Sequence, residues 1–150
     1  MHVPATNADP RQILQTCRTI AVLGAHWSAD RPACYVPEYL FQQGYQVFAV
    51  NPMGVGRVLW GQPVGATLAE IKEPIDMVDV FRRPTDLAAH LDDIAAMQPL
   101  PQVVWLQLGI RNDSFAESLR ALGITVVQDR CTLADHRRLG LPPRPSGHGS

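Results

Sequence analysis

Glycine and polar residues follow the first two apolar segments of this chain, where an open α/β sheet would bind a phosphorylated ligand. The apolar run 19–23 ends on Gly24, and the run 46–50 ends on Asn51. A glycine after a buried strand lets the backbone approach a pyrophosphate, and the helix that follows adds amide donors and partial positive charge. This pattern predicts a nucleotide site that opens on Gly24, with a sharp turn as the alternative interpretation.

The end of the second apolar run bears on which nucleotide would bind. A NAD site usually carries Asp or Glu there, about 20 residues past the glycines, to hold the ribose hydroxyls. This chain has Asn51-Pro52 and no acid at that point. Pro52 fixes a turn, and Asn51 either contacts an adenosine or forms an Asx turn. The sequence therefore disfavours NAD and leaves room for a ligand with an additional phosphate.

Strand and helix patterns alternate along the chain. We expect strands at 19–24, 46–50, 76–81, 102–107 and 125–128, separated by helical segments of about ten residues. Such alternation predicts an α/β, Rossmann-like three-layer fold with a five-stranded parallel sheet. The expected strand order is 3-2-1-4-5, with a ligand at the switch point between the first and fourth strands.

The length of 150 residues and the 46% hydrophobic content favour one domain with a substantial core. Residues 9–14 predict a short leading helix capped by Asp9. We therefore divide the chain into an N-terminal helix within 1–17, a Rossmann-like domain at 18–139 and a tail at 140–150. The tail is rich in Pro, Gly and Ser and is predicted to be disordered.

Composition narrows the class of partner. The net charge of −1 gives none of the basic excess typical of nucleic-acid binding. Three scattered cysteines favour a reducing, cytoplasmic location over a disulfide framework. No apolar run approaches a membrane span, and no group of residues has metal-ligand spacing. We expect a small-molecule nucleotide ligand, no metal, no nucleic acid and no membrane.

The residues at the predicted strand ends resemble a known family. In order they match the small stand-alone CoA-binding proteins of the CoA_binding_2 type, which are similar to the CoA-binding domain of the succinyl-CoA synthetase α-subunit. The matching segments are Ile20-Ala21-Val22-Leu23-Gly24-Ala25, Arg31-Pro32, Tyr39-Leu40, Gly44-Tyr45, Val50-Asn51-Pro52, Asp76-Met77-Val78-Asp79-Val80-Phe81-Arg82-Arg83-Pro84, Trp105-Leu106-Gln107-Leu108-Gly109 and Val127-Gln128-Asp129-Arg130-Cys131.

The resemblance implies that the chain binds coenzyme A or an acyl-CoA as a stand-alone module. It carries over no catalytic residue, and the chain is not expected to be an enzyme. The protein partner, if any, is not identified by the sequence. The implied ligand-binding residues are Gly24, Ala25, His26, Arg31, Asn51, Pro52, Arg57, Arg82, Arg83, Pro84, Gln107 and Gly109.

Individual arginines have specific expected roles. Arg57 would take the ribose 3′-phosphate that distinguishes CoA from NAD, although loop arginines are usually solvated. Adjacent residues in a strand point to opposite faces. One of Arg82 and Arg83 is therefore expected to shape the site, while the other pairs with Asp79 or Asp129. Near the last strand, Asp129 and Arg130 favour a structural ion pair, and Cys131 is the best candidate for a reactive thiol or else packs in the core.

Two alternative functions stay open. The first is an NAD(P)-type nucleotide site, against which the missing acid after the second strand argues. The second is a protein-interaction module whose ligand site has decayed. Two departures from the family pattern favour this second alternative: His26 stands where the family usually has a small serine, and Tyr35 where it has a close-approach glycine.

Overall fold

The structure, a computed structural model, describes residues 8–144. Its centre is a five-stranded parallel sheet in the order β2-β1-β5-β6-β7. This confirms the α/β class and the five-stranded parallel sheet. The strands are β1 (Thr19–Leu23), β2 (Gln46–Val50), β5 (Met77–Val80), β6 (Val103–Leu106) and β7 (Thr125–Val127).

The observed order corresponds to the 3-2-1-4-5 pattern, with one difference in which segment takes the third place. The segment expected as the third strand, β5, pairs with β1 on the side away from β2. The place outside β2 is taken by the chain around Gly65, which forms a parallel bridge with Val50. The switch point therefore lies between β1 and β5, and not between the first and fourth strands expected from the sequence.

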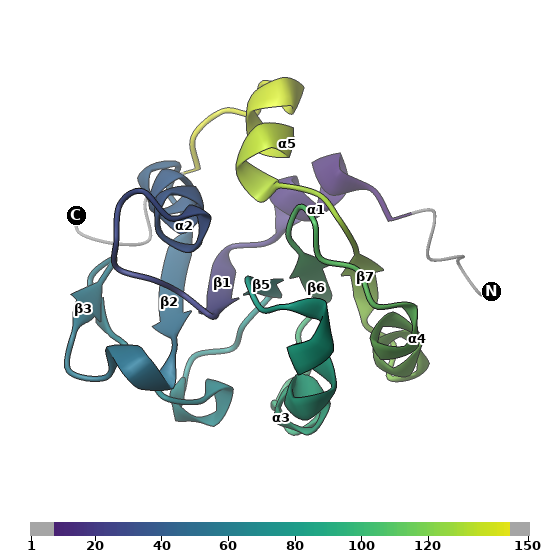
Figure 1. The fold of residues 1–150 in the computed structure, drawn as a ribbon. Helices are drawn as coiled ribbons and strands as arrows, with labels where there is room; N and C mark the ends of the chain where they lie inside the picture. The colour runs from purple at the N-terminus through teal and green to yellow at the C-terminus, as the bar shows by residue number, and fades with distance from the viewer. Residues whose placement is uncertain (1–7, 145–150) are drawn as a thin grey trace.

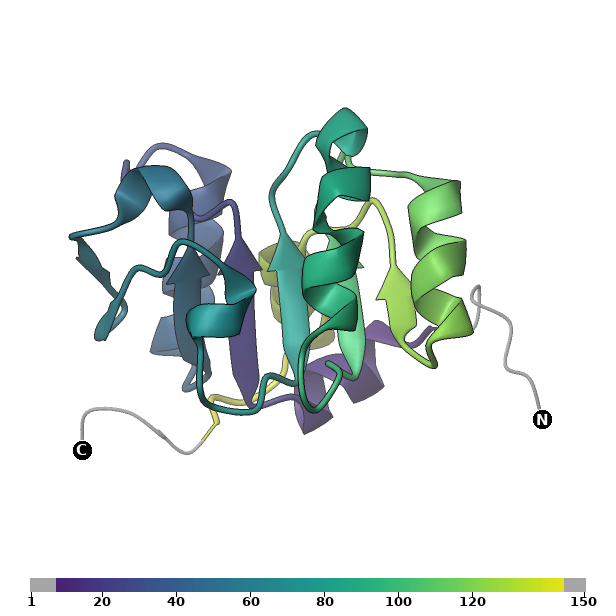
Figure 2. The same cartoon turned by 90° about the horizontal axis from the view of Figure 1, so that it is seen from below.

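Helices cover both faces of the sheet, as Figures 1 and 2 show. One face carries α1 (Pro10–Thr16), α2 (Pro32–Gln42) and α5 (Thr132–Leu139). The other carries the 3-10 helix η4 (Pro84–His90), α3 (Leu91–Ala95) and α4 (Asp113–Ala121). The remaining elements are η2 (Pro52–Gly54), the hairpin of β3 (Val58–Leu59) and β4 (Gln62–Pro63), and η3 (Leu68–Glu70).

Alternate residues of each strand supply two hydrophobic cores. Along β1, Ile20 and Val22 enter the core beneath α1 and α2, while Ala21 and Leu23 enter the core beneath α3 and α4. This explains why the strands read as continuous apolar runs, since a parallel sheet covered on both faces has no solvent side. The two cores fix the strands whose carboxyl ends carry the site.

Local signals account for several helix ends. Asp9 caps α1 by accepting a hydrogen bond from the Arg11 amide, as the sequence predicts. The expected helix at 84–95 begins as the 3-10 helix η4 before it continues as α3. Among the described residues, no helix combines the length and the hydropathy needed to cross a membrane.

Residues 141–144, the first part of the tail expected to be disordered at 140–150, contact the domain. Leu141 packs against the core beneath α1 and α2. Arg144 donates from its amide to the Gln43 carbonyl at 2.7 Å and from its guanidinium to the Gln15 carbonyl. The amino-acid composition of this segment could not predict these contacts, because they are made with residues far away in the sequence. Residues 145–150 lie outside the described residues.

Candidate functional site

A cleft of about 620 Å³ opens at the carboxyl edge of the sheet, above the ends of β1 and β5. All of the predicted ligand-binding residues line it except Ala25, Pro52 and Arg57. Residues that were singled out for other reasons, Tyr35 and Cys131, line it as well. The topology thus brings one constellation together from five separate segments of the chain, at the switch point where open α/β sheets bind ligands.

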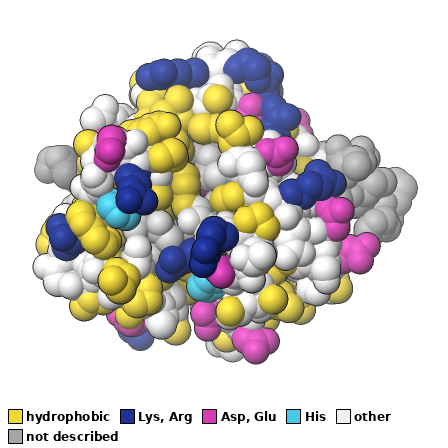
Figure 3. Space-filling model, viewed as in Figure 1, with side chains coloured by type: hydrophobic (Ala, Val, Ile, Leu, Met, Phe, Trp, Pro, Cys, Tyr) yellow, Lys and Arg dark blue, Asp and Glu magenta, His cyan; other side chains and the backbone are white. Residues whose placement is uncertain are grey.

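The lining of the cleft is cationic. Arg31, Arg82, Arg83 and His26 line it, and no Asp or Glu is among the described lining residues. Figure 3 looks onto this edge and shows dark blue arginine and lysine side chains among yellow hydrophobic ones near the middle of the face. A chain with a net charge of −1 therefore concentrates positive charge where the strands end, and such a cleft favours an anionic ligand.

Gly24 ends β1 with a backbone that only glycine adopts readily. Its φ is +89°, and a Cβ atom there would lie 2.7 Å from the Phe81 carbonyl oxygen and 3.2 Å from Cδ of Arg82. The missing side chain lets the ends of β1 and β5 approach each other beneath the cleft. The glycine predicted from the strand pattern is thus required by the geometry of the switch point.

Asn51 joins the loops that follow β1 and β2. Its amide nitrogen donates to the Ala25 carbonyl at 2.8 Å, and its side-chain oxygen accepts from the Met53 amide at 2.9 Å. The Asx turn considered from the sequence is therefore present, although Asn51 also lines the cleft. Ala25 is fully buried and contributes this carbonyl rather than a cleft surface, while Pro52 begins η2 on the exposed side.

His26 and Arg57 are connected through an aromatic residue that sequence reasoning missed. The His26 ring stacks on Trp27 with centroids 4.4 Å apart and an interplanar angle of 11°. The Arg57 guanidinium carbon lies 4.2 Å from the centroid of the Trp27 ring. The available signal was a tryptophan in the loop that follows a glycine-terminated strand.

A buried polar cluster underlies the opposite part of the cleft. The Gln107 amide nitrogen donates to Asp79 Oδ1 at 2.5 Å and to Thr132 Oγ1 at 2.8 Å. The Thr132 hydroxyl donates to Asp79 Oδ2 at 3.3 Å. Burial raises the pKa of Asp79 to about 7, and the hydrogen bonds from Gln107 and Thr132 partly oppose that rise. The signal for Asp79 was a lone carboxylate inside an otherwise apolar strand.

The two adjacent arginines after β5 adopt different environments. Arg83 is exposed and forms an ion pair with Asp86 at 3.1 Å, so the expected pairing of one arginine with Asp79 or Asp129 is wrong. Arg82 is half-buried and lines the cleft, and its Nε atom has no hydrogen-bond partner among the described residues. Asp86 lies one helical turn beyond Arg83, which makes that local pair easier to form than a long-range one.

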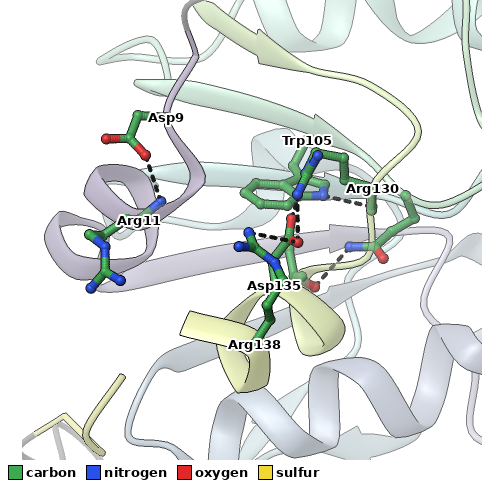
Figure 4. A network of polar contacts seen from close by, with 8 residues as sticks. Asp9, Arg11, Trp105, Arg130, Asp135 and Arg138 are labelled. Carbon is green, nitrogen blue, oxygen red and sulfur yellow. Dashed lines mark hydrogen bonds and ion pairs between the residues drawn. The ribbon is translucent and has the colours of Figure 1, made fainter. Parts of the chain in front are cut away.

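The loop after β7 is held by long-range polar contacts. Asp129 has a φ of 57° and accepts a hydrogen bond from the Gly109 amide at 2.7 Å. Arg130 forms a two-point ion pair with Asp135 at 2.7 and 2.8 Å, shown in Figure 4 with the bond from Trp105 to the Arg130 carbonyl. Arg130 thus pairs with Asp135 and not with Asp129. Cys131 follows as the N-cap of α5.

The three thiols have different environments. Cys17 is fully buried, and burial raises the pKa of its thiol to about 12. Cys34 is half-buried outside the cleft lining, with a pKa also raised, chiefly by burial. Cys131 is half-buried and lines the cleft. Among the described residues, no group of three or more His, Cys, Asp or Glu side chains could hold a metal ion.

Comparison with known proteins assigns this arrangement to a family. The model of the CoA_binding_2 family, described as a CoA binding domain, matches residues 18–137. The chain belongs to this CoA-binding domain family. The match spans the whole sheet and every segment that lines the cleft. Family membership supports the binding of CoA in general and confirms the resemblance found at the strand ends.

Relatives of this CoA-binding domain include a curated protein of Bacillus subtilis (strain 168), the uncharacterized protein YneT. It is 32% identical over 131 residues, which cover 87% of this chain and 94% of YneT. Among solved structures, cell-free ID.343 from Thermus thermophilus has a TM-score of 0.83 and 46% identity, covering 91% of this chain and 99% of that one.

A hypothetical protein from Pyrococcus horikoshii OT3 is a further structural neighbour of this CoA-binding domain. It has a TM-score of 0.81 and 28% identity, with 94% of this chain and 99% of that chain covered. Both neighbours share nearly their full length with this chain. The likeness therefore extends over most of this chain and nearly the whole of each neighbour.

Proposed function

We propose that this chain binds coenzyme A or an acyl-CoA in the cleft above β1 and β5, as a stand-alone module without a reaction of its own. The observation that carries the proposal is the charge of the cleft: three arginines line it, and no carboxylate is among its described lining residues. Arginine is suited to bind phosphate through its planar set of donors. The pyrophosphate of CoA is the anionic group that such a cleft would hold.

Two further features fit a pyrophosphate ligand. Gly24 lines the cleft at the start of the β1–α2 loop, where the backbone ahead of a helix can meet a phosphate, and its φ of +89° is one that glycine adopts readily. The Arg82 guanidinium has an Nε atom without a protein partner among the described residues. Arg31 sits at the N-cap of α2 without a side-chain capping bond of its own.

The polar side chains of the cleft support binding rather than catalysis. The Asn51 amide links two loops, the Gln107 amide holds Asp79 and Thr132, and Nδ1 of His26 accepts from the Ser28 amide at 3.0 Å. Each of these groups therefore already has a structural hydrogen bond. This arrangement maintains the shape of the cleft and leaves ligand recognition to the arginines and the backbone.

Thermal unfolding with CoA, acetyl-CoA or NAD tests the proposal. Ligand at about 100 times its dissociation constant adds roughly 2.7 kcal/mol, which raises Tm by about 5–10 °C for a chain of this length. We expect the shift with CoA or acetyl-CoA and none with NAD. Arg82→Gln should weaken the shift, while Arg111→Gln, at an exposed position outside the cleft, should not.

The alternatives make different predictions in the same experiment. A shift with NAD and none with CoA would favour the NAD(P)-type site. No shift with CoA, acetyl-CoA or a longer acyl-CoA at millimolar concentration would contradict the proposal and favour a protein-interaction module.

A further inference from the structure

A row of three side chains leads from the edge of the cleft to the loop after β2. His26 lines the cleft, its ring stacks on Trp27, and the Arg57 guanidinium lies over the Trp27 ring at 4.2 Å. Arg57 does not line the cleft itself. The row therefore extends the cationic surface of the cleft beyond its edge, in the direction of the β3–β4 hairpin.

The backbone on both sides of this row is fixed. A Cβ atom on Gly54 would lie 2.9 Å from the Trp27 ring, so Trp27 lies directly against the loop after β2. The bond from Asn51 to Ala25 ties the same two loops together. Arg57 donates from its amide to the Gly54 carbonyl at 3.0 Å and accepts at its own carbonyl from the Val64 amide at 2.9 Å.

The guanidinium of Arg57 lies over the Trp27 ring. Cation–π contact places the cation over the aromatic face without a hydrogen bond, so it does not use the N–H donors of the guanidinium. No ion pair of Arg57 with a carboxylate occurs within residues 8–144, and the segment 51–57 contains no acid. Arg57 is thus a positioned cation with donors available for an external anion.

The position of this cation relates it to the ribose of a nucleotide. In βαβ nucleotide sites, the end of the second strand faces the ribose, where an acid holds free hydroxyls and a nearby arginine accommodates a ribose phosphate. The segment that follows β2 here begins with Asn51 and carries Arg57. A free ribose hydroxyl would meet no acid in this segment, whereas a phosphate monoester would meet a guanidinium.

We propose that Trp27 is a positioning residue for Arg57, and that the pair selects nucleotides that carry a phosphate monoester on the adenosine ribose. This inference rests on the proposed function, because it names the part of the CoA molecule that Arg57 recognises. Trp27 contributes by stacking, which holds the flexible arginine side chain in one place before the ligand arrives. The ligand then orders fewer rotatable bonds on binding.

Isothermal titration calorimetry with CoA and dephospho-CoA tests the inference, since the two ligands differ only in the 3′-phosphate. A hydrogen bond to a charged group corresponds to about 10- to 100-fold in affinity. We expect the wild type to prefer CoA by about tenfold or more. Arg57→Gln and Trp27→Leu should remove most of that preference while leaving the affinity for dephospho-CoA near the wild-type value.

Two further variants separate positioning from general loop disruption. Trp27→Phe keeps an aromatic face for the guanidinium and should retain the preference for CoA. The double variant Trp27→Leu with Arg57→Gln should show no smaller preference than Arg57→Gln alone, because Trp27 acts through Arg57. Arg111→Gln, at an exposed arginine outside the cleft lining, should leave the preference unchanged.

The outcomes distinguish the inference from the proposed function. Equal affinity of the wild type for CoA and dephospho-CoA would overturn the inference while supporting CoA binding. A full preference for CoA in Trp27→Leu would show that Arg57 needs no positioning and would overturn the role of Trp27. Failure of the folded wild type to bind either ligand would contradict the proposed function, and the inference with it.

Discussion

The two sides of the cleft are supported by different kinds of interaction. On the β1–β2 side, comprising the segments 24–36 and 51–57, the loops are joined by the uncharged Asn51 amide and by the stack on Trp27. On the β5–β6 side, comprising the segments 81–84 and 107–110 with Cys131, the floor rests on the buried carboxyl of Asp79. One cleft thus combines a side joined by an amide link and ring stacking with a side that rests on a buried carboxyl, whose pKa burial raises to about 7.

The largest effect is expected where the two sides meet. Gly24→Ala should lower the free energy of unfolding by about 2–5 kcal/mol, because a positive φ and a close backbone contact both oppose a side chain. Gly123→Ala is the matched control, since Gly123 has the same φ of +89° but no atom within 4 Å of the place its Cβ would take. It should cost only about 1–2 kcal/mol.

Denaturant unfolding of both variants measures the difference. Equal losses of unfolding free energy in the two variants would show that the close contact with the Phe81 carbonyl does not add to the cost of a side chain at Gly24. The same denaturant titration with CoA present would show whether the added methyl group also removes the stabilisation by the ligand. We expect that loss because Gly24 lines the cleft.

The pH dependence of stability should distinguish the β5–β6 side. Burial raises the pKa of Asp79 from 3.8 to about 7, so the native state holds a proton that the unfolded state has lost between these values. This contribution is fully present below pH 3.8 and is lost as the pH rises through about 7, with a total of up to about 4 kcal/mol. The native chain should therefore lose stability from this group between about pH 3.8 and about pH 7 and stay level above that range.

Asp79→Asn isolates that contribution. Burial lowers the pKa values of His90 and His136, so these two groups act with the opposite sign and reduce stability as the pH falls below about 6.5. They are unchanged in the variant. Subtracting the two profiles of unfolding free energy against pH should leave a difference that rises in favour of Asp79→Asn from about pH 3.8 to about pH 7 and is level above that. A flat difference would mean that Asp79 stays ionised in the native state.

The β1–β2 side should respond to loss of an uncharged link. Asn51→Ala removes a donor to the buried Ala25 carbonyl and an acceptor for the Met53 amide, and should cost about 1–3 kcal/mol. Asn51→Asp keeps the acceptor and removes the donor. It should restore the turn but not the link between loops, and should bind CoA more weakly than the wild type in calorimetry. Equal affinity would show that the link does not shape the cleft.

Sequence patterns could predict the strands because each signal was local or periodic. The apolar runs, Gly24 at the end of β1 and Asn51 at the end of β2 are readable within a few residues, and together they placed most of the proposed ligand-binding residues around one cleft. The place of β5 beside β1 is instead a long-range pairing, and the edge of β2 pairs with the chain around Gly65. Local patterns do not report which strands pair.

The missed contacts have a related physical explanation. Trp27 and Arg57 are 30 positions apart and meet only because the loops after β1 and β2 are tied together. Asp79 was considered as an ion-pair partner for an arginine, yet its partners are the neutral side chains of Gln107 and Thr132. Residue type alone did not show that the carboxyl lies beneath the cleft rather than in it.

The smallest effect concerns the thiols and tests which side a ligand covers. Cys131 lines the cleft on the β5–β6 side, Cys34 lies at the start of α2 outside the lining, and Cys17 is fully buried with a pKa raised to about 12 by burial. Iodoacetamide should label Cys131 and Cys34 in the native protein and reach Cys17 only on unfolding, because the thiolate is the reactive species and must be accessible. If CoA covers the β5–β6 side, CoA at 100 times its dissociation constant should slow labelling of Cys131 by up to about a hundredfold, because only about one chain in a hundred is then free of ligand.

Labelling of Cys34 serves as the internal control and should keep its rate. Peptide mass mapping over time gives all three rates in one experiment. Equal protection of Cys34 and Cys131 would indicate a general loss of opening motions, whereas protection of Cys34 alone would place the ligand on the β1–β2 side and leave the titrating floor uncovered.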